Sequence, residues 1–227
     1  GGILNGDIRY EIYPKGGEGI TIGLFYKQFN DPIELRIDGQ SVLTRRIYSY
    51  QNADEAYTIG GELEVRKNLS FIGNMWEHFD FFGNLTVSQS QVKLGGSNTI
   101  ERPLQGQSPY LINAGFQYNN KDWNGSLLYN RIGQRLSLVG AYEIGVGGIP
   151  DIYERSRNLV DFQLAKKIMN NKGELKLTWS DILGESFYFY ENIDSKRSFK
   201  DGTDRLFNAY KPGSTISIGF TYNFSLK

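Results

Sequence analysis

The sequence predicts an all-β fold in which the chain forms part of an antiparallel transmembrane β-barrel. Three observations predict it. Apolar and polar residues alternate with a period of two in nine separate runs, which is the pattern of strands with one apolar face. The connections between these runs alternate between short turns and long polar loops. The chain also contains no run of 18 or more apolar residues, so a transmembrane helix is not expected.

The nine runs follow one another along the whole chain. In the second run, Ile20, Ile22, Leu24 and Tyr26 alternate with a second set of residues that includes Thr21. Such alternation places one set on each face of a strand. The predicted strands cover residues 8–13, 20–27, 57–66, 81–88, 110–118, 126–130, 160–165, 174–180 and 216–224.

The lengths of the connections predict two different rims. Short turns are expected at 14–19, 119–122 and 169–173, with a link of intermediate length at 67–78, and long polar loops at 29–54, 93–108, 138–155 and 183–213. Short turns on one side and long loops on the other are the layout of an outer-membrane barrel. A soluble β-sandwich or lipocalin-like barrel would also alternate, but loops of this length are uncommon in compact soluble domains.

Composition excludes several classes of function. The 227 residues carry 25 basic and 25 acidic side chains, so no nucleic-acid partner is expected. Cysteine is absent and His78 is the single histidine, which excludes a cysteine nucleophile, a histidine-based triad and a multi-histidine metal site. We therefore expect no catalytic, cofactor-binding or metal-binding residues and do not expect an enzyme.

The number of strands predicts that the barrel continues upstream. Single-chain bacterial barrels have an even number of strands and place their short turns in the periplasm. The last strand follows the long 183–213 loop, so the C-terminus is expected in the periplasm, and the first of nine strands would then also descend from outside. At least one further strand is therefore expected before residue 1, and the absence of a signal peptide after Gly1 fits that expectation.

Several segments resemble the C-terminal barrel of TonB-dependent outer-membrane receptors, in the form common among Bacteroidetes-type bacteria. They are GGELEVRKNL at 60–69, RPLQGQSPYLINAG at 102–115, YNRIGQR at 129–135 and SDIL at 180–183, together with Tyr153-Glu154-Arg155. The segments occur in the expected order and cover almost the whole chain.

The resemblance implies a role in importing a scarce nutrient across the bacterial outer membrane. Members have 22 strands around an N-terminal plug, so residues 1–227 would be the C-terminal segment of the barrel, with the plug and the upstream strands outside this chain. The implied partners are outer-membrane lipid, the plug and remaining strands, the TonB–ExbB–ExbD motor acting through a TonB box outside this chain, and the barrel-assembly machinery.

Two groups of residues are candidates for specific roles. The final run places Gly219, Tyr222 and Phe224 in a pattern similar to the signal that the assembly machinery recognises, although a plain amphipathic final strand would have the same alternation. On the polar side of the third run, Glu62, Glu64 and Arg66 could contact cargo or the plug, or bond to neighbouring lumen side chains.

Two further segments lie in the last long loop. Asp194, Asp201 and Asp204 could supply oxygen ligands to Ca²⁺, but a solvated turn is the simpler interpretation. The aromatic residues 187–190 could grip a ligand or pack the base of the loop.

Two other functions compete with nutrient import. A passive porin-like pore, or another outer-membrane barrel independent of TonB, would need no plug. A soluble β-rich binding module would need no lipid. The identity of a nutrient (chelated iron, cobalamin, glycan or peptide) does not follow from these residues.

Overall fold

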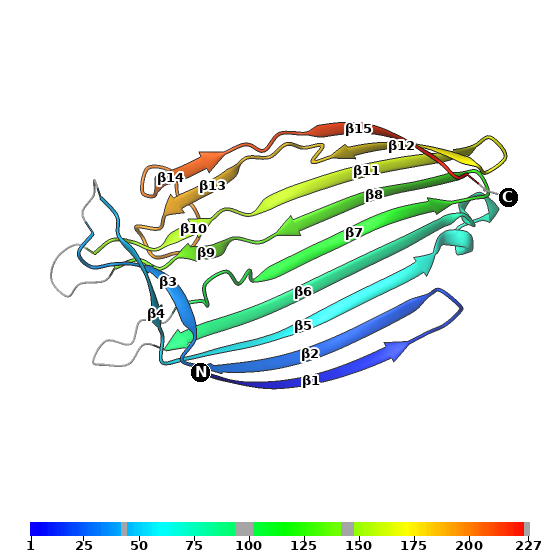
Figure 1. Ribbon diagram of the computed structural model, residues 1–227. Coiled ribbons are helices and arrows are strands. Elements are labelled where there is room, and N and C mark those ends of the chain that lie inside the picture. Colours follow the sequence, from blue (N-terminus) through cyan, green and yellow to red (C-terminus); the bar gives the residue numbers. More distant parts are fainter. Residues whose placement is uncertain (42–44, 94–101, 142–147, 225–227) are drawn as a thin grey trace.

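The computed structural model describes residues 1–41, 45–93, 102–141 and 148–224. Its main element is a single antiparallel sheet in which nine strands pair in chain order. Figure 1 shows them side by side in one layer, with β1 and β15 at the two edges. The strands are β1 (Gly2–Ile12), β2 (Gly19–Asn30), β5 (Glu55–Asn68), β6 (Phe79–Lys93), β7 (Tyr110–Asn119), β8 (Trp123–Ile132), β11 (Arg157–Ile168), β12 (Gly173–Ser180) and β15 (Thr215–Tyr222).

These strands confirm the predicted all-β antiparallel fold, and each of the nine runs corresponds to one strand. Most strands extend beyond their predicted bounds, as β6 does by running from Phe79 to Lys93 rather than from 81 to 88, and the two ends of the sheet also differ from the prediction. β1 begins at Gly2 rather than at Ile8, because it pairs along β2 as far as Asn30. The last strand ends at Tyr222 rather than at residue 224, because its partner β12 begins at Gly173, which lies opposite Tyr222.

The two ends of the sheet differ, as the connection lengths predict. At one end lie the short links 13–18, 120–122 and 169–172, and a longer one with two single-turn 3₁₀ helices, η1 (Leu69–Phe71) and η2 (Asn74–Trp76). At the other end lie the long connections. We call these ends the short-turn rim and the long-loop rim. Figure 1 shows the C-terminus at the first and the N-terminus at the second.

The long connections are more ordered than the sequence predicts. They contain a hairpin of β3 (Ile33–Ile37) and β4 (Tyr48–Asn52), and a second sheet of β9 (Arg135–Leu138), β10 (Ile152–Glu154), β13 (Phe187–Glu191) and β14 (Arg205–Tyr210). The order of this sheet, β14-β13-β10-β9, repeats the order β15-β12-β11-β8 of the main sheet. The second sheet therefore prolongs the same wall. Its strands have three to six residues, too few to produce a clear alternation in the sequence.

Strand register keeps the apolar and the polar residues of each strand on opposite faces of the main sheet. Directly opposite residues share a face. Leu63 lies opposite Leu85, and Leu85 lies opposite Ile112. The apolar face comprises Ile8, Tyr10, Ile12, Ile20, Ile22, Leu24, Tyr26, Ile59, Leu63, Val65, Phe81, Leu85, Val87, Ile112, Ala114, Phe116, Leu127, Tyr129, Val160, Phe162, Leu164, Leu175, Leu177, Trp179, Ile216, Ile218 and Phe220.

The opposite, polar face comprises Asp7, Arg9, Glu11, Thr21, Lys27, Thr58, Glu62, Glu64, Arg66, Asn84, Thr86, Ser88, Asn113, Gln117, Ser126, Asn130, Asp161, Gln163, Lys176, Thr178, Ser217 and Thr221. Large apolar side chains on it lie over glycines. A Cβ on Gly60 would meet the ring of Phe25, and one on Gly115 would meet Phe82 and Leu128. Glycine is required there because a neighbouring ring occupies the space.

Buried apolar residues gather at the long-loop rim. One cluster joins Leu136, Val139, Tyr153 and Tyr190 of the second sheet and its links. Another comprises Ala53, Ala56 and Val92, with Phe29 and Leu104 packed against it.

The apolar face of the main sheet is exposed by contrast. Leu24 keeps 62% of its surface accessible and Ile218 keeps 74%. No second layer covers these side chains within the described residues. An apolar area this large marks a contact with lipid or protein.

Within the described ranges, no helix has the length and apolar character needed to cross a membrane.

Candidate functional site

Aromatic residues border the apolar face at both rims. At the short-turn rim, the ring of Phe79 lies 5.3 Å from Trp76 and 4.8 Å from Tyr118. At the long-loop rim, Tyr110 lies opposite Val87, eight residues along β6 from Phe79. At about 3.3 Å per residue, the two levels are roughly 26 Å apart along the strand. With the strand tilt of roughly 35–45° in outer-membrane barrels, this corresponds to roughly 20 Å of height, somewhat less than their apolar band of about 25 Å.

The three candidate contact residues of β5 share the polar face. Glu64 lies opposite Thr21 of β2 and Asn84 of β6 in the ladders, and Glu62 and Arg66 flank it on the same face of β5. All three side chains are exposed, and none has a hydrogen bond or ion pair to another described residue. Bonding to neighbouring lumen side chains, the simpler interpretation of this row, is therefore not seen within the described part of the chain. Their charges are available to whatever lies against this face.

The candidate assembly residues lie at the short-turn end of β15. Gly219 is on the polar face opposite Lys176, and a Cβ there would meet nothing within 4 Å, so packing does not require glycine. Tyr222 ends the strand, and Phe224 lies beyond it with 82% of its surface exposed. Their rings meet edge to face at 4.7 Å. The backbone N–H of Asn223 still donates to the carbonyl of Lys172 at 2.8 Å, which holds this end against the last turn.

A buried ion pair ties the β3–β4 hairpin to the segment that begins at Arg102. The guanidinium of Arg102 donates two hydrogen bonds to the carboxylate of Glu34, one of them 2.8 Å long. Their side chains are only 3% and 1% exposed. Next to them, the amide of Gln105 donates to the carbonyls of Leu35 and Ser137 at 3.1 and 2.6 Å. The segment after residue 101 thus joins the hairpin to the second sheet.

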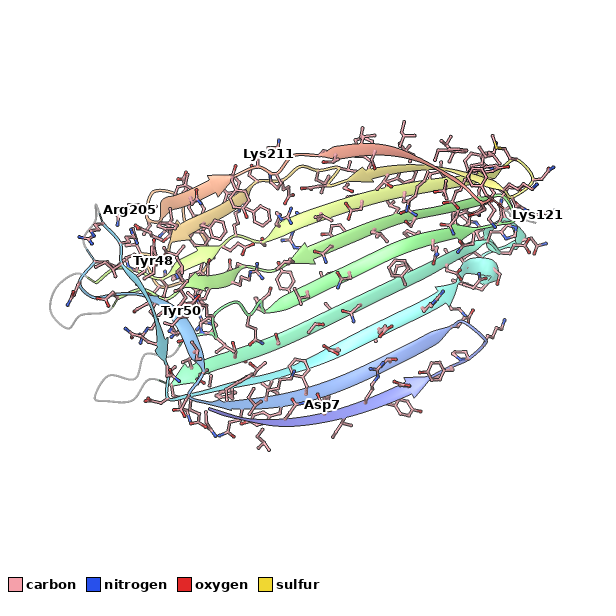
Figure 2. All side chains as sticks on the ribbon, in the orientation of Figure 1. Asp7, Tyr48, Tyr50, Lys121, Arg205 and Lys211 are labelled. Atoms are coloured by element: carbon pink, nitrogen blue, oxygen red, sulfur yellow. The ribbon has the colours of Figure 1, made fainter. Side chains whose placement is uncertain are left out.

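A second ionic contact joins the hairpin loop to β13 and β14. The buried carboxylate of Glu191 pairs with Arg46 and, at 2.8 Å, with Arg205. The guanidinium of Arg46 also lies 5.1 Å from the ring centre of Phe207. Figure 2 shows Tyr48 and Tyr50 of β4 at the same end as Arg205, opposite the turn that carries Lys121. The sequence gives no sign of these pairs, because their partners lie in different loops.

Most aromatic side chains of β13 pack against other aromatic side chains of the long-loop rim. Tyr190 is buried against Tyr153 and Phe199, with ring centres 6.2 and 5.3 Å apart. Burial raises the pKa of Tyr190 to about 12 and also raises the pKa of Tyr153, so both phenols stay neutral at physiological pH. Phe187 stacks on Tyr210 at 4.7 Å. Packing at the loop base is therefore the better interpretation for residues 187–190.

The acidic residues of the last loop do not form a cation site. Both carboxylate oxygens of Asp204 are occupied, since they accept from the backbone N–H groups of Ile193 and Lys200 at 2.9 and 2.7 Å. Among the described residues, no group of three or more histidine, cysteine, aspartate or glutamate side chains is arranged to hold a metal ion. Asp204 thus links Ile193 and Lys200 within the last loop.

Comparison with known proteins identifies relatives of this arrangement. Residues 5–171 match a family model described as "TonB dependent receptor-like, beta-barrel". No curated protein matches the sequence.

Three solved structures share the fold. The copper transporter OprC has a TM-score of 0.62 and 12% identity, and the match covers 98% of this chain and 31% of that one. The FrpB iron transporter from Neisseria meningitidis has a TM-score of 0.60, 12% identity and coverage of 98% and 31%. A variant of the ferric enterobactin receptor PfeA from Pseudomonas aeruginosa has a TM-score of 0.54, 13% identity and coverage of 81% and 26%. The chain spans about a third of the length of these proteins.

Proposed function

Since the chain belongs to the TonB-dependent receptor-like β-barrel family, a family of outer-membrane proteins, we propose that it forms part of the barrel wall of a transporter that imports a scarce nutrient across the outer membrane. The observation that carries the proposal is the division of one nine-stranded layer into an uncovered apolar face and a polar face. Lipid would cover the first and a wet interior would lie against the second. The solved neighbours are named as transporters and a receptor, not as enzymes.

Residues 1–227 are proposed to be the C-terminal segment of a 22-stranded barrel of the Bacteroidetes-type form. β1 and β15 each have one edge without a partner strand among the described residues. In lipid each unsatisfied backbone group costs several kcal/mol, so further strands must cover these edges. In this arrangement the short-turn rim and the C-terminus are periplasmic, and Gly219, Tyr222 and Phe224 are recognised by the assembly machinery.

Refolding of residues 1–227 alone in detergent tests this assignment. The expected result is no compact monomer with heat-modifiable gel migration, because two open edges invite aggregation. A protease-resistant monomer in which β1 pairs with β15 would show that the nine strands close by themselves.

The interior row of Glu62, Glu64 and Arg66 is proposed to contact cargo or a plug. The support is their exposure on the polar face without a bonding partner among the described residues. Import would draw its energy from the TonB–ExbB–ExbD motor. This chain shares only its fold with the solved metal transporters, so the cargo of those proteins is not proposed for it.

Nutrient uptake by cells that carry the intact gene tests the proposal. Deleting the gene should slow growth when a required nutrient is scarce, and dissipating the proton-motive force should abolish the gene-dependent uptake. Replacing Glu62, Glu64 and Arg66 together by glutamine should reduce uptake, whereas Lys176→Gln on the same face should not. Uptake that survives loss of the proton-motive force would instead support a passive pore.

A further inference from the structure

A hollow of about 400 Å³ opens where the main sheet passes into the second sheet. Its lining includes Arg131 near the end of β8, Asn158 near the start of β11, and Glu185 between β12 and β13. Arg155 lines it from the link between β10 and β11. None of these residues belongs to the polar row proposed to contact cargo.

Hydrogen bonds fix the side chains of Glu185, Asn158 and Arg131 around this hollow. Both oxygens of Glu185 accept from Asn158, at 2.8 Å from the backbone N–H and 2.8 Å from the side-chain amide. Arg131 donates through Nη1 to the amide oxygen of Asn158 at 2.7 Å and through Nε to the hydroxyl of Tyr110 at 3.2 Å. These bonds, together with a hydrogen bond between its side chain and Tyr129, hold its guanidinium in place.

Arg155 adds a second positive charge. Its side chain is exposed and has no hydrogen bond or ion pair to a described residue. The hydroxyls of Ser156 and Ser186 also line the hollow. The lining thus combines two arginines and two serines with one carboxylate, whose oxygens already accept hydrogen bonds from Asn158. This donor set suits a ligand that only accepts hydrogen bonds and carries negative charge, such as a phosphate group, which arginine binds through two parallel bonds.

The position of the hollow indicates the source of the phosphate. Strand register places Arg131 opposite Ile112 and Asn158 opposite Arg131, which puts both residues on the apolar face. Arg131 donates to the hydroxyl of Tyr110, the aromatic residue that borders the apolar face at the long-loop rim. Aromatic residues at such a border lie at the level of lipid headgroups. Acyl chains of a lipid held at Arg131 would lie along the apolar face below.

We propose that this hollow binds a phosphate group of an outer-leaflet lipid headgroup. The inference rests on the proposed outer-membrane placement with the long-loop rim outward. A lipid held there would bridge β8, β11 and the link before β13, and would fasten the second sheet to the top of the main sheet. Basic pockets at the membrane surface bind lipid phosphates in the same way.

Lipid titration of the intact protein in zwitterionic detergent tests the proposal, with native mass spectrometry as the readout. The probes are diphosphoryl lipid A, the same lipid after removal of its phosphates, and inorganic phosphate. The expected result is tight binding of the diphosphoryl lipid, at least tenfold weaker binding by Arg155→Gln, and no effect of Lys176→Gln, which removes one positive charge from the polar face. Added salt should weaken binding by the wild type more than by Arg155→Gln.

Three results would overturn the proposal. Equal binding of the dephosphorylated lipid would exclude a phosphate site, and equally tight binding of inorganic phosphate would make it a site for free anions. Unchanged lipid binding by Arg155→Gln would exclude this hollow. The choice of Arg155 avoids a folding artefact, because its side chain makes no hydrogen bond or ion pair with a described residue, whereas Arg131 is bonded to several neighbours. Nutrient uptake by Arg155→Gln cells reports on transport separately, so failure of one proposal is distinguishable from failure of the other.

Discussion

Replacing Leu85 by arginine should destabilise the protein, because this side chain lies on the proposed lipid-facing surface between the two rims. Leu85 is six residues from Phe79 at one rim and two from Val87, which lies opposite Tyr110 at the other rim. At about 3.3 Å per residue, it is roughly 20 Å along the strand from the first level and roughly 7 Å from the second. An arginine costs about 2–4 kcal/mol at the midplane of a β-barrel and about 0–1 kcal/mol near an interface, so a loss of about 1–3 kcal/mol is expected here.

The adjacent position supplies a matched control. Thr86 is at the same depth but on the polar face, opposite Glu62. Thr86→Arg should change the free energy of unfolding little, since an exposed ion pair contributes at most about 1 kcal/mol. The two variants should therefore differ by about 1–3 kcal/mol, or about 5- to 150-fold in the folding equilibrium.

Reversible urea unfolding of the intact protein in lipid vesicles measures both variants. Equal losses for Leu85→Arg and Thr86→Arg would refute the assignment of the two faces. Leu24→Arg and Ile218→Arg should behave like the first variant, and Thr21→Arg and Ser217→Arg like the second.

Other substitutions probe the long-loop rim, the packing and the turns. Glu34→Gln leaves the charge of Arg102 buried and unpaired, so backbone amides of β3 should lose about 3–5 kcal/mol of protection against hydrogen exchange. Gly60→Val places a Cβ 2.6 Å from the carbonyl oxygen of Val87, so thermal unfolding should show a loss of about 1–3 kcal/mol. A hydrogen bond from Lys67 at 2.7 Å lowers the pKa of Glu18. This pair therefore stabilises the turn at pH values above the unfolded-state pKa of Glu18, and the stabilisation is lost as pH falls through the lowered pKa. Acid titration of the free energy of unfolding should show that loss.

Each of these has its own control. Removing both charges with Glu34→Met and Arg102→Leu should restore most of the protection lost in Glu34→Gln, because no buried charge remains. Gly23→Ala should be nearly neutral, since its nearest contact would be 3.9 Å away. Lys67→Gln should make stability less dependent on pH below about 4.3, the usual pKa of a glutamate. Unchanged acid dependence in that variant would contradict the role of the pair.

Much of the fold follows from the sequence because the relevant signals are local. Alternation with a period of two is a property of a single strand, so Ile216, Ile218 and Phe220 identify one face of β15 without knowledge of its neighbours. The lengths of the connections likewise reveal the two rims. The exposed row of Glu62, Glu64 and Arg66 was predictable for the same reason, since all three residues lie on one strand.

Other features were decided only by the tertiary structure, because they join residues that are distant in the sequence. Arg102 and Glu34 are 68 positions apart and meet only because β3 folds against the segment after residue 101. The hollow beside Arg131 combines two strands and two links, and no single segment contains its pattern. The need for glycine at position 60 depends on the register that places Phe25 beside it. Thus the alternation of the sequence by itself determined the strands and their faces, whereas strand pairing decided which loops, charges and rings come into contact.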